Sequence, residues 1–140
     1  MTNAELAGRL TRAVASTNTE FDLIAITDEL RSSQAGLSVV PTILRFMEAQ
    51  PEADFGAPGA LVHFVESFIG AGYESELLSS LARRPTTHTT WMLNRLINGT
   101  TKAADRSRYI QVMTAIVDHS ATDDVTRQAA TRWLARLAHP

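Results

Sequence analysis

Apolar residues recur at helical spacing in almost every segment of this 140-residue chain, and this periodicity constrains its fold more than any other feature. Near the start, Leu6, Leu10 and Val14 follow one another at four-residue steps, which places them on one side of a helix. No segment shows the sustained alternation of apolar and polar residues that is typical of a half-buried strand. The chain is therefore predicted to be all-α.

Start and stop signals divide the chain into about eight short helices, and Pro51 to Gly59 forms the longest loop. Thr17 and Glu20 have the spacing of a capping box at the start of the second helix. The predicted helices cover about residues 3–15, 18–33, 39–49, 59–69, 73–84, 84–99, 105–119 and 123–138. Inward-facing residues expected in the second, fourth and last helices include Phe21, Ile24, Ala25, Leu30, Leu61, Phe64, Val65, Phe68, Ile69, Val125, Ala129, Trp133, Leu134 and Leu137.

Short connections favour antiparallel helix pairs within one domain, residues 1–140. The last helix resembles the second helix of a HEAT repeat, because Val125 and Arg127 come early, small residues follow and leucines come late. This resemblance favours an irregular, HEAT-like α-solenoid, while a closed helical bundle remains the alternative.

Composition narrows the compartment and the available chemistry. The chain has no cysteine, which rules out disulfides and thiolate metal sites. Its first residues lack the basic start and apolar run of a signal peptide, and no stretch approaches the roughly 20 apolar residues of a membrane-spanning helix. A soluble, cytoplasmic protein is expected.

The net charge of −2 hides an asymmetry between the two parts of the chain. Residues 1–66 contain nine acidic residues and four arginines, a balance of −5, whereas residues 67–140 have a balance of +3. An acidic surface suits a basic protein partner. The simpler interpretation is two solvated surfaces that differ in charge.

Motifs for catalysis or cofactor binding are missing from the sequence. There is no G-x-S-x-G motif and no glycine-rich phosphate loop. His63 and Glu66 have a spacing that a metal site could use, but no second pair accompanies them, so a solvated helix face is the expected role. We predict no enzymatic activity, no metal and no cofactor.

The helix expected at 84–99 has an unusual polar side. Met92, Leu93, Leu96 and Ile97 fall within one arc, whereas Trp91, Asn94, Arg95 and Asn98 fall on the opposite arc. Because tryptophan and arginine are enriched at binding hot spots, this side is one candidate contact surface. In a stack of helices, the same side could instead be covered by a neighbour.

Three segments of the chain resemble a family of small all-helical immunity proteins of bacterial polymorphic toxin systems, including contact-dependent growth inhibition. They are Gly59 to Glu66, Tyr73 to Leu78, and the distinctive string P-T-T-H-T-T-W-M-L-N-R from Pro85 to Arg95. The resemblance covers roughly residues 40–120. It implies a protein that binds a cognate toxin domain in the cytoplasm and blocks it, either by plugging the active site or by binding beside it.

Toxins of such systems are often basic nucleases, so the resemblance implies a basic protein partner, with no direct contact to nucleic acid or membrane. We expect a monomer that binds one toxin C-terminal domain. The candidate contact residues are the acidic set Glu20, Asp22, Asp28, Glu29, Glu48, Glu52 and Asp54, together with Trp91, Asn94 and Arg95.

Two other functions remain open from the sequence. One is a HEAT-like adaptor that serves a different protein assembly. The other is an RNA-binding helical repeat, for which regularly recurring base-contacting positions are missing. Its basic residues would be Arg83, Arg84, Arg95, Lys102, Arg106 and Arg108.

Overall fold

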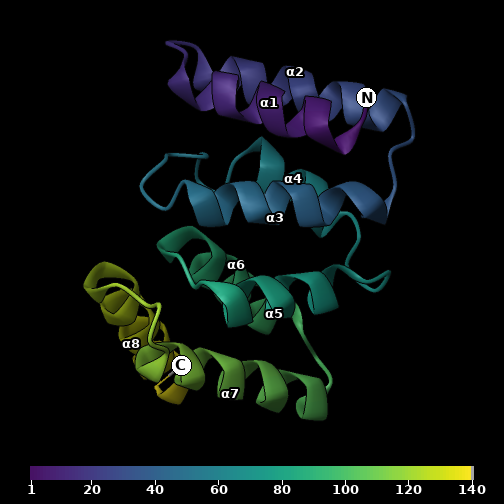
Figure 1. Cartoon of the computed structure of the whole chain (residues 1–140). Helices are drawn as coiled ribbons and strands as arrows, with labels where there is room; N and C mark the ends of the chain where they lie inside the picture. Colours follow the sequence, from purple (N-terminus) through teal and green to yellow (C-terminus); the bar gives the residue numbers. More distant parts are fainter. Residues whose placement is uncertain (140) are drawn as a thin grey trace. The chain divides into compact units, whose positions relative to one another are not determined.

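The computed structural model describes residues 1–139, and over them the chain forms eight α-helices, one short 3₁₀ helix and no strand (Figure 1). The all-α prediction is confirmed. The chain divides into two compact units: unit 1 is Met1–Glu76 and unit 2 begins at Leu77. The expectation of one domain over residues 1–140 stays a prediction.

Unit 1 is built from two helix pairs. The first pair is α1 (Asn3–Ala15) and α2 (Thr19–Ser32), and the second is α3 (Val40–Ala49) and α4 (Ala60–Glu66). The 3₁₀ helix η1 (Leu37–Val39) leads directly into α3. α1 packs on both α2 and α3, and α2 also packs on α4, so that the two pairs are layered (Figure 1). The HEAT-like solenoid stays a prediction, with the closed bundle as its alternative.

α2 presents a different face to the core from the one expected. Leu23, Ile26 and Leu30 are buried, whereas Phe21 is 73% exposed and Ile24 is 44% exposed. Ala25 is exposed as well. Apolar residues occur on two arcs of this helix, so spacing alone allowed either arc to face inward. The arc that packs against α1 and α4 is the one centred on Leu23 and Ile26.

The loop between α3 and α4 folds back on itself, so that the backbone at Gly59 lies close to the backbone at Phe55. A side chain at Gly59, whose φ is +94°, would bring its Cβ within 1.6 Å of the Phe55 carbonyl oxygen. Only glycine fits this position. Phe55 is itself buried and packs edge-on against Phe46, with 5.7 Å between ring centroids. The loop therefore has a defined shape beside α2.

α4 is shorter than the predicted segment 59–69. It ends at Glu66, and the following residues form a series of tight turns, with Ile69 bonded to the Glu66 carbonyl. Gly70 has a φ of +82°, which closes this turn. Phe68 is consequently only partly buried, and Ile69 is 51% exposed, in contrast to the inward position expected for both.

Unit 2 contains most of α5 (Tyr73–Arg83) and all of α6 (Thr87–Gly99), α7 (Ala103–Asp118) and α8 (Asp124–Ala138). The last three pack against one another. Val125 of α8, which was expected inward, is 64% exposed, because the buried side of this helix is formed by smaller residues instead. These are Thr126, Ala129 and Ala130.

Helix ends differ from prediction where side-chain capping decides them. The capping box lies at Thr2 and Glu5, at the start of α1, while α2 begins after Asn18 without a side-chain cap. α6 is capped by Thr86 together with Thr89. α6 begins at Thr87, three residues later than predicted, and ends at Gly99. No helix in residues 1–139 is long and apolar enough to cross a membrane.

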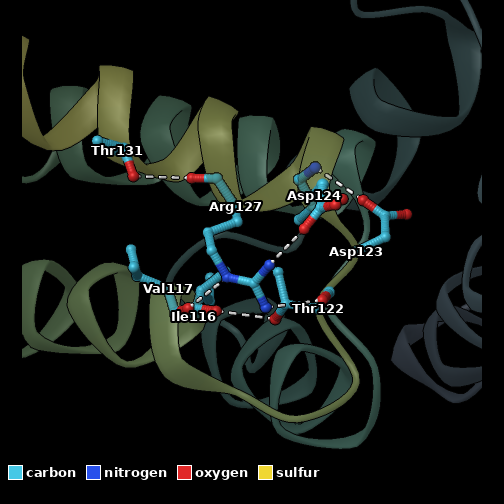
Figure 2. Close-up of polar contacts among 8 residues, drawn as sticks. Ile116, Val117, Thr122, Asp123, Asp124, Arg127 and Thr131 are labelled. Atoms are coloured by element: carbon cyan, nitrogen blue, oxygen red, sulfur yellow. Dashed lines mark hydrogen bonds and ion pairs between the residues drawn. The ribbon is translucent and has the colours of Figure 1, made fainter.

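Arg127 fastens the turn between α7 and α8 (Figure 2). Its Nε donates to the Val117 carbonyl at 2.8 Å, and its Nη2 donates to the Thr122 carbonyl at 3.0 Å. Its Nη1 donates to Asp124 at 2.8 Å. The carbonyls at the end of α7 have no partners within the helix, so Arg127 supplies donors that they lack. The early arginine of the HEAT-like pattern thus has a structural role here.

Candidate partner-binding surface

The outward side of α2 combines exposed apolar and acidic residues. We call this the α2 face: Glu20, Phe21, Ile24, Ala25 and Asp28, all of them exposed. Phe21 points directly away from the buried arc, and Ile24 lies one turn further along the same side. Single exposed apolar residues are ordinary, but an exposed phenylalanine next to an exposed isoleucine, with carboxylates at both ends, makes this face a candidate contact site.

Two hollows, each of about 430 Å³, line the edge of α2 nearest the loop. The first lies among Val14, Glu20, Leu23 and Asp54. The second lies among Ile24, Asp28, Arg31 and His63. Glu20, Gly56 and Ala57 line both hollows, so the two meet along one seam between α2 and the loop. Both volumes are in the range of pockets that hold ligands or side chains.

The four acidic residues of α2 divide between two sides. Glu29 forms an ion pair with Arg9 of α1, and Asp22 accepts a hydrogen bond from the Ser16 hydroxyl at 2.7 Å. These two carboxylates therefore fasten α2 to α1. Glu20 and Asp28 line the seam on the other side. The structure separates residues that the sequence grouped as one acidic set.

The remaining acidic candidates differ in accessibility. Glu48 is only 8% exposed and interacts within the protein, so a partner would not reach it on the surface of unit 1. Glu52 is exposed. Asp54 is exposed too, and its Oδ1 accepts a hydrogen bond from the Gly56 backbone at 2.9 Å. Glu52 and Asp54 thus add charge to the loop beside the seam, whereas Glu48 belongs to the interior.

The candidates on α6 occupy a covered helix. Asn94 is 8% exposed, and Thr90, one turn before it, is fully buried. Trp91 is partly buried and meets the ring of His88 edge-on, at 5.6 Å between centroids. Arg95 is partly buried and interacts within the protein. This burial favours the packing interpretation of the Trp91 side over the contact interpretation.

Charge divides more sharply between the units than between the segments compared from sequence. Unit 1 contains eleven acidic and four basic residues, a net charge of −7. Unit 2, taken from Leu77 to the end of the chain, contains four acidic and nine basic residues, a net charge of +5. The α2 face therefore lies on a strongly negative unit, whose field attracts basic partners.

Other chemistry is sparse in the described part of the chain. Residues 1–139 contain no group of three or more His, Cys, Asp or Glu residues arranged to hold a metal ion. The pKa of Asp123 is lowered, first by the hydrogen bond from the Thr126 backbone and then by the Thr126 hydroxyl, with smaller contributions from Arg84 and Arg127. This carboxylate caps α8 and lies outside the α2 face.

Several of the basic residues considered for RNA binding interact with other residues of the protein. Arg83, Arg84 and Arg95 interact within the protein. Arg108 lies over the ring of Tyr109, at 5.1 Å from its centroid.

Comparison of the chain with protein-family models, curated proteins and solved structures finds no match to any of them.

The acidic candidates from the sequence include Glu20 and Asp28 of the α2 face, but the apolar residues of this face were not among the candidates. Phe21 and Ile24 were placed in the core because they are large and have helical spacing. A second apolar arc, through Leu23, Ile26 and Leu30, was present on the same helix. A helix with two apolar arcs and packing partners for only one of them leaves the other exposed, and that was the available signal.

Proposed function

We propose that this protein is an immunity protein, which binds a cognate bacterial toxin domain in the cytoplasm and neutralises it without catalysis of its own. The observation that carries the proposal is the α2 face. There, Phe21 is 73% exposed beside Ile24, with Glu20 and Asp28 at the two ends, on a unit of net charge −7.

The physical logic is that of a protein interface with an apolar centre and a charged rim. Burying Phe21 and Ile24 against a partner removes apolar surface from water, which provides affinity. Carboxylates around them attract a basic partner and raise the association rate, most strongly at low salt. The same arrangement disfavours acidic partners, which provides specificity.

The kind of partner follows from charge together with the resemblance of the segments at 59–66, 73–78 and 85–95 to immunity proteins. A nuclease must attract phosphates, so its substrate-binding surface is basic. An acidic surface competes for the same groups, either over the active site or beside it. We therefore propose a basic nuclease domain as the toxin, bound by one copy of this protein.

The test is co-expression with the C-terminal domain of the protein encoded directly upstream of this gene. We expect the domain alone to stop growth and degrade nucleic acid, and co-expression to restore both growth and nucleic-acid integrity. The two proteins should also co-purify as a one-to-one complex. Growth arrest that persists at matched expression levels, with no co-purification, would refute the proposal.

A third outcome concerns the alternative of a HEAT-like adaptor. An adaptor would co-purify with its partner but leave that partner's activity unchanged. Nuclease assays on the purified complex and on the free domain distinguish the two functions directly. Equal activity in both samples would contradict an immunity function, even if binding were tight.

A further inference from the structure

The seam between α2 and the loop has two acidic residues, Glu20 and Asp28, separated by eight positions on α2. Glu20 and Asp28 both line the second hollow, and Ile24 lies midway between them. Eight residues of α-helix rise about 12 Å, so the two carboxylates start from positions about 12 Å apart along the axis, with an apolar side chain halfway. The seam therefore presents acidic, apolar and acidic groups in sequence.

The opposite wall of the seam is backbone-rich and apolar. It is formed by Gly56, Ala57, Pro58 and Ala60, with His63 at its α4 end. Residues this small leave room between the loop and α2, and the positive φ of Gly59 with its close approach to the Phe55 carbonyl restricts the conformation of the loop. An extended chain is one of the forms in which a partner segment can occupy a groove between a helix and a loop.

An extended peptide matches this spacing. Residues four positions apart in an extended chain are about 13 Å apart and point to the same side, with the residue between them also on that side. A segment of the pattern basic-x-apolar-x-basic would thus place its cations at Glu20 and Asp28 and its apolar side chain on Ile24. The charges of groove and segment are complementary.

We propose that the α2 seam binds an extended basic segment of the partner protein, with the pattern basic-x-apolar-x-basic. This inference deepens the proposed function and rests on it for the identity of the partner, but the groove can be tested without the partner. Asp22 and Glu29 take no part, because they contact Ser16 and Arg9 on the other side of α2.

A substitution at Arg31 is expected to strengthen binding of the segment instead of weakening it. The Arg31 Nη1 lies 3.6 Å from Asp28 Oδ1, beyond the usual hydrogen-bond distance, and its guanidinium lies over the Phe64 ring at 5.7 Å. An incoming cation at Asp28 must compete with this weak pair. Replacing Arg31 by glutamine should therefore strengthen binding of the segment, whereas most substitutions at a binding site weaken it.

The experiment is an NMR titration of the full chain with the peptide acetyl-Lys-Ala-Leu-Ala-Lys-amide. The control peptide, acetyl-Lys-Ala-Leu-Lys-Ala-amide, has the same composition but places the second lysine on the other side of an extended chain. The test variant Glu20→Gln/Asp28→Asn is matched by Asp22→Asn/Glu29→Gln, which removes the same charge from the same helix. Circular dichroism confirms that both variants are folded.

We expect amide shifts at Ile24, Asp28, Gly56, Ala57 and His63. The dissociation constant should rise about tenfold in Glu20→Gln/Asp28→Asn and change less than twofold in the matched variant, because each removed ion pair is exposed. Arg31→Gln should lower it. No saturable shifts, equal binding of the control peptide, or shifts confined to the Arg9 side of α2 would each overturn the inference.

The same variants separate this inference from the proposed function. If Glu20→Gln/Asp28→Asn still protects cells and binds the toxin domain as tightly as the wild type, then the seam is not the binding site, although an immunity function stands. If the wild-type protein gives no protection while the peptide binds as expected, then the immunity function fails and the groove remains.

Discussion

The two units of this chain differ in what their charged and polar side chains contact. In unit 2, two polar side chains fasten helices to one another: Arg127 binds the end of α7, and His119 bonds the Ala82 carbonyl at 2.8 Å. In unit 1, two carboxylates of α2 do the same, but Glu20 and Asp28 face outward beside exposed apolar residues. This difference indicates that the exposed acidic and apolar residues on α2 do not serve the stability of unit 1.

Exposed apolar residues follow the same division. Among residues 1–139, the large hydrophobic side chains that are clearly exposed are Met1, Phe21, Ile24 and Ile69 in unit 1, and Val125 in unit 2. Phe21 and Ile24 are the ones that share a helix face. Substitutions at the side chains that fasten the helices of unit 2 should therefore change stability, whereas substitutions on the α2 face should change binding.

The largest stability effect is expected at Trp91 of α6. Because Trp91 is partly buried and meets the His88 ring edge-on, Trp91→Ala should lower the free energy of unfolding by about 3 kcal/mol. Chemical denaturation monitored by circular dichroism measures it. A melting temperature equal to that of the wild type, combined with lost partner binding, would restore the contact interpretation of this side of α6.

A smaller loss is expected at Arg127. Arg127→Ala removes donors from the Val117 and Thr122 carbonyls and should cost about 2 kcal/mol, because each bond comes from a charged group to a helix end or turn. Arg132→Ala, an exposed arginine on the same helix, is the control and should change stability by less than about 0.5 kcal/mol. Equal effects of the two substitutions would mean that the α7–α8 turn does not depend on Arg127.

The pH dependence of unit 2 should involve Asp123. Its carboxylate accepts a hydrogen bond from the Thr126 backbone at 2.8 Å, and this bond lowers its pKa below the ordinary value of 3.8. A lowered pKa in the folded state means stability that is present above about pH 4 and lost as the pH falls through the folded pKa.

Asp123→Ala should therefore cost about 1 kcal/mol at neutral pH, and the difference from wild type should shrink in acid. Asp123→Asn is the matched control, because asparagine caps a helix about as well but does not titrate. Its stability relative to Asp123→Ala should stay constant with pH. A wild-type advantage over Asp123→Ala that persists undiminished in acid would contradict this role of the charge.

The smallest stability effect is expected on the α2 face. Phe21→Ser should change the free energy of unfolding by less than about 0.5 kcal/mol, because the side chain is 73% exposed and its removal leaves no cavity. Differential scanning calorimetry of the wild type and variant measures this. A loss of about 2 kcal/mol or more would mean that Phe21 packs against the protein in solution, and the α2 face would lose its apolar centre.

Most of the helices could be predicted from the sequence, because apolar periodicity and terminal residues are local signals. Helix α1 begins and ends where expected, and the loop from Pro51 to Gly59 separates α3 from α4 as predicted. The errors occur where a choice depended on distant residues. Which arc of α2 is buried depends on the positions of α1 and α4, and the end of α4 depends on the turn at Gly70.

The candidate surface was only partly predictable for the same reason. Charge is a property of composition, so the acidic first part of the chain was visible without a structure. The separation of Glu20 and Asp28 from Asp22 and Glu29 required the position of Arg9 and Ser16 on α1. Glu48 could not be recognised as buried, because its burial depends on how α3 packs.

The central claim is that the α2 face binds the partner, and one pair of dissociation constants tests it most directly. Phe21→Ser and Val125→Ser each replace an exposed apolar residue on a helix, at 73% and 64% exposure. The wild type and both variants would be titrated by calorimetry against the partner domain identified by the co-expression test, in an inactivated form. We predict that the dissociation constant of Phe21→Ser is at least about 30-fold higher than that of the wild type, and that the dissociation constant of Val125→Ser equals that of the wild type. Equal affinities of the two variants would contradict the claim.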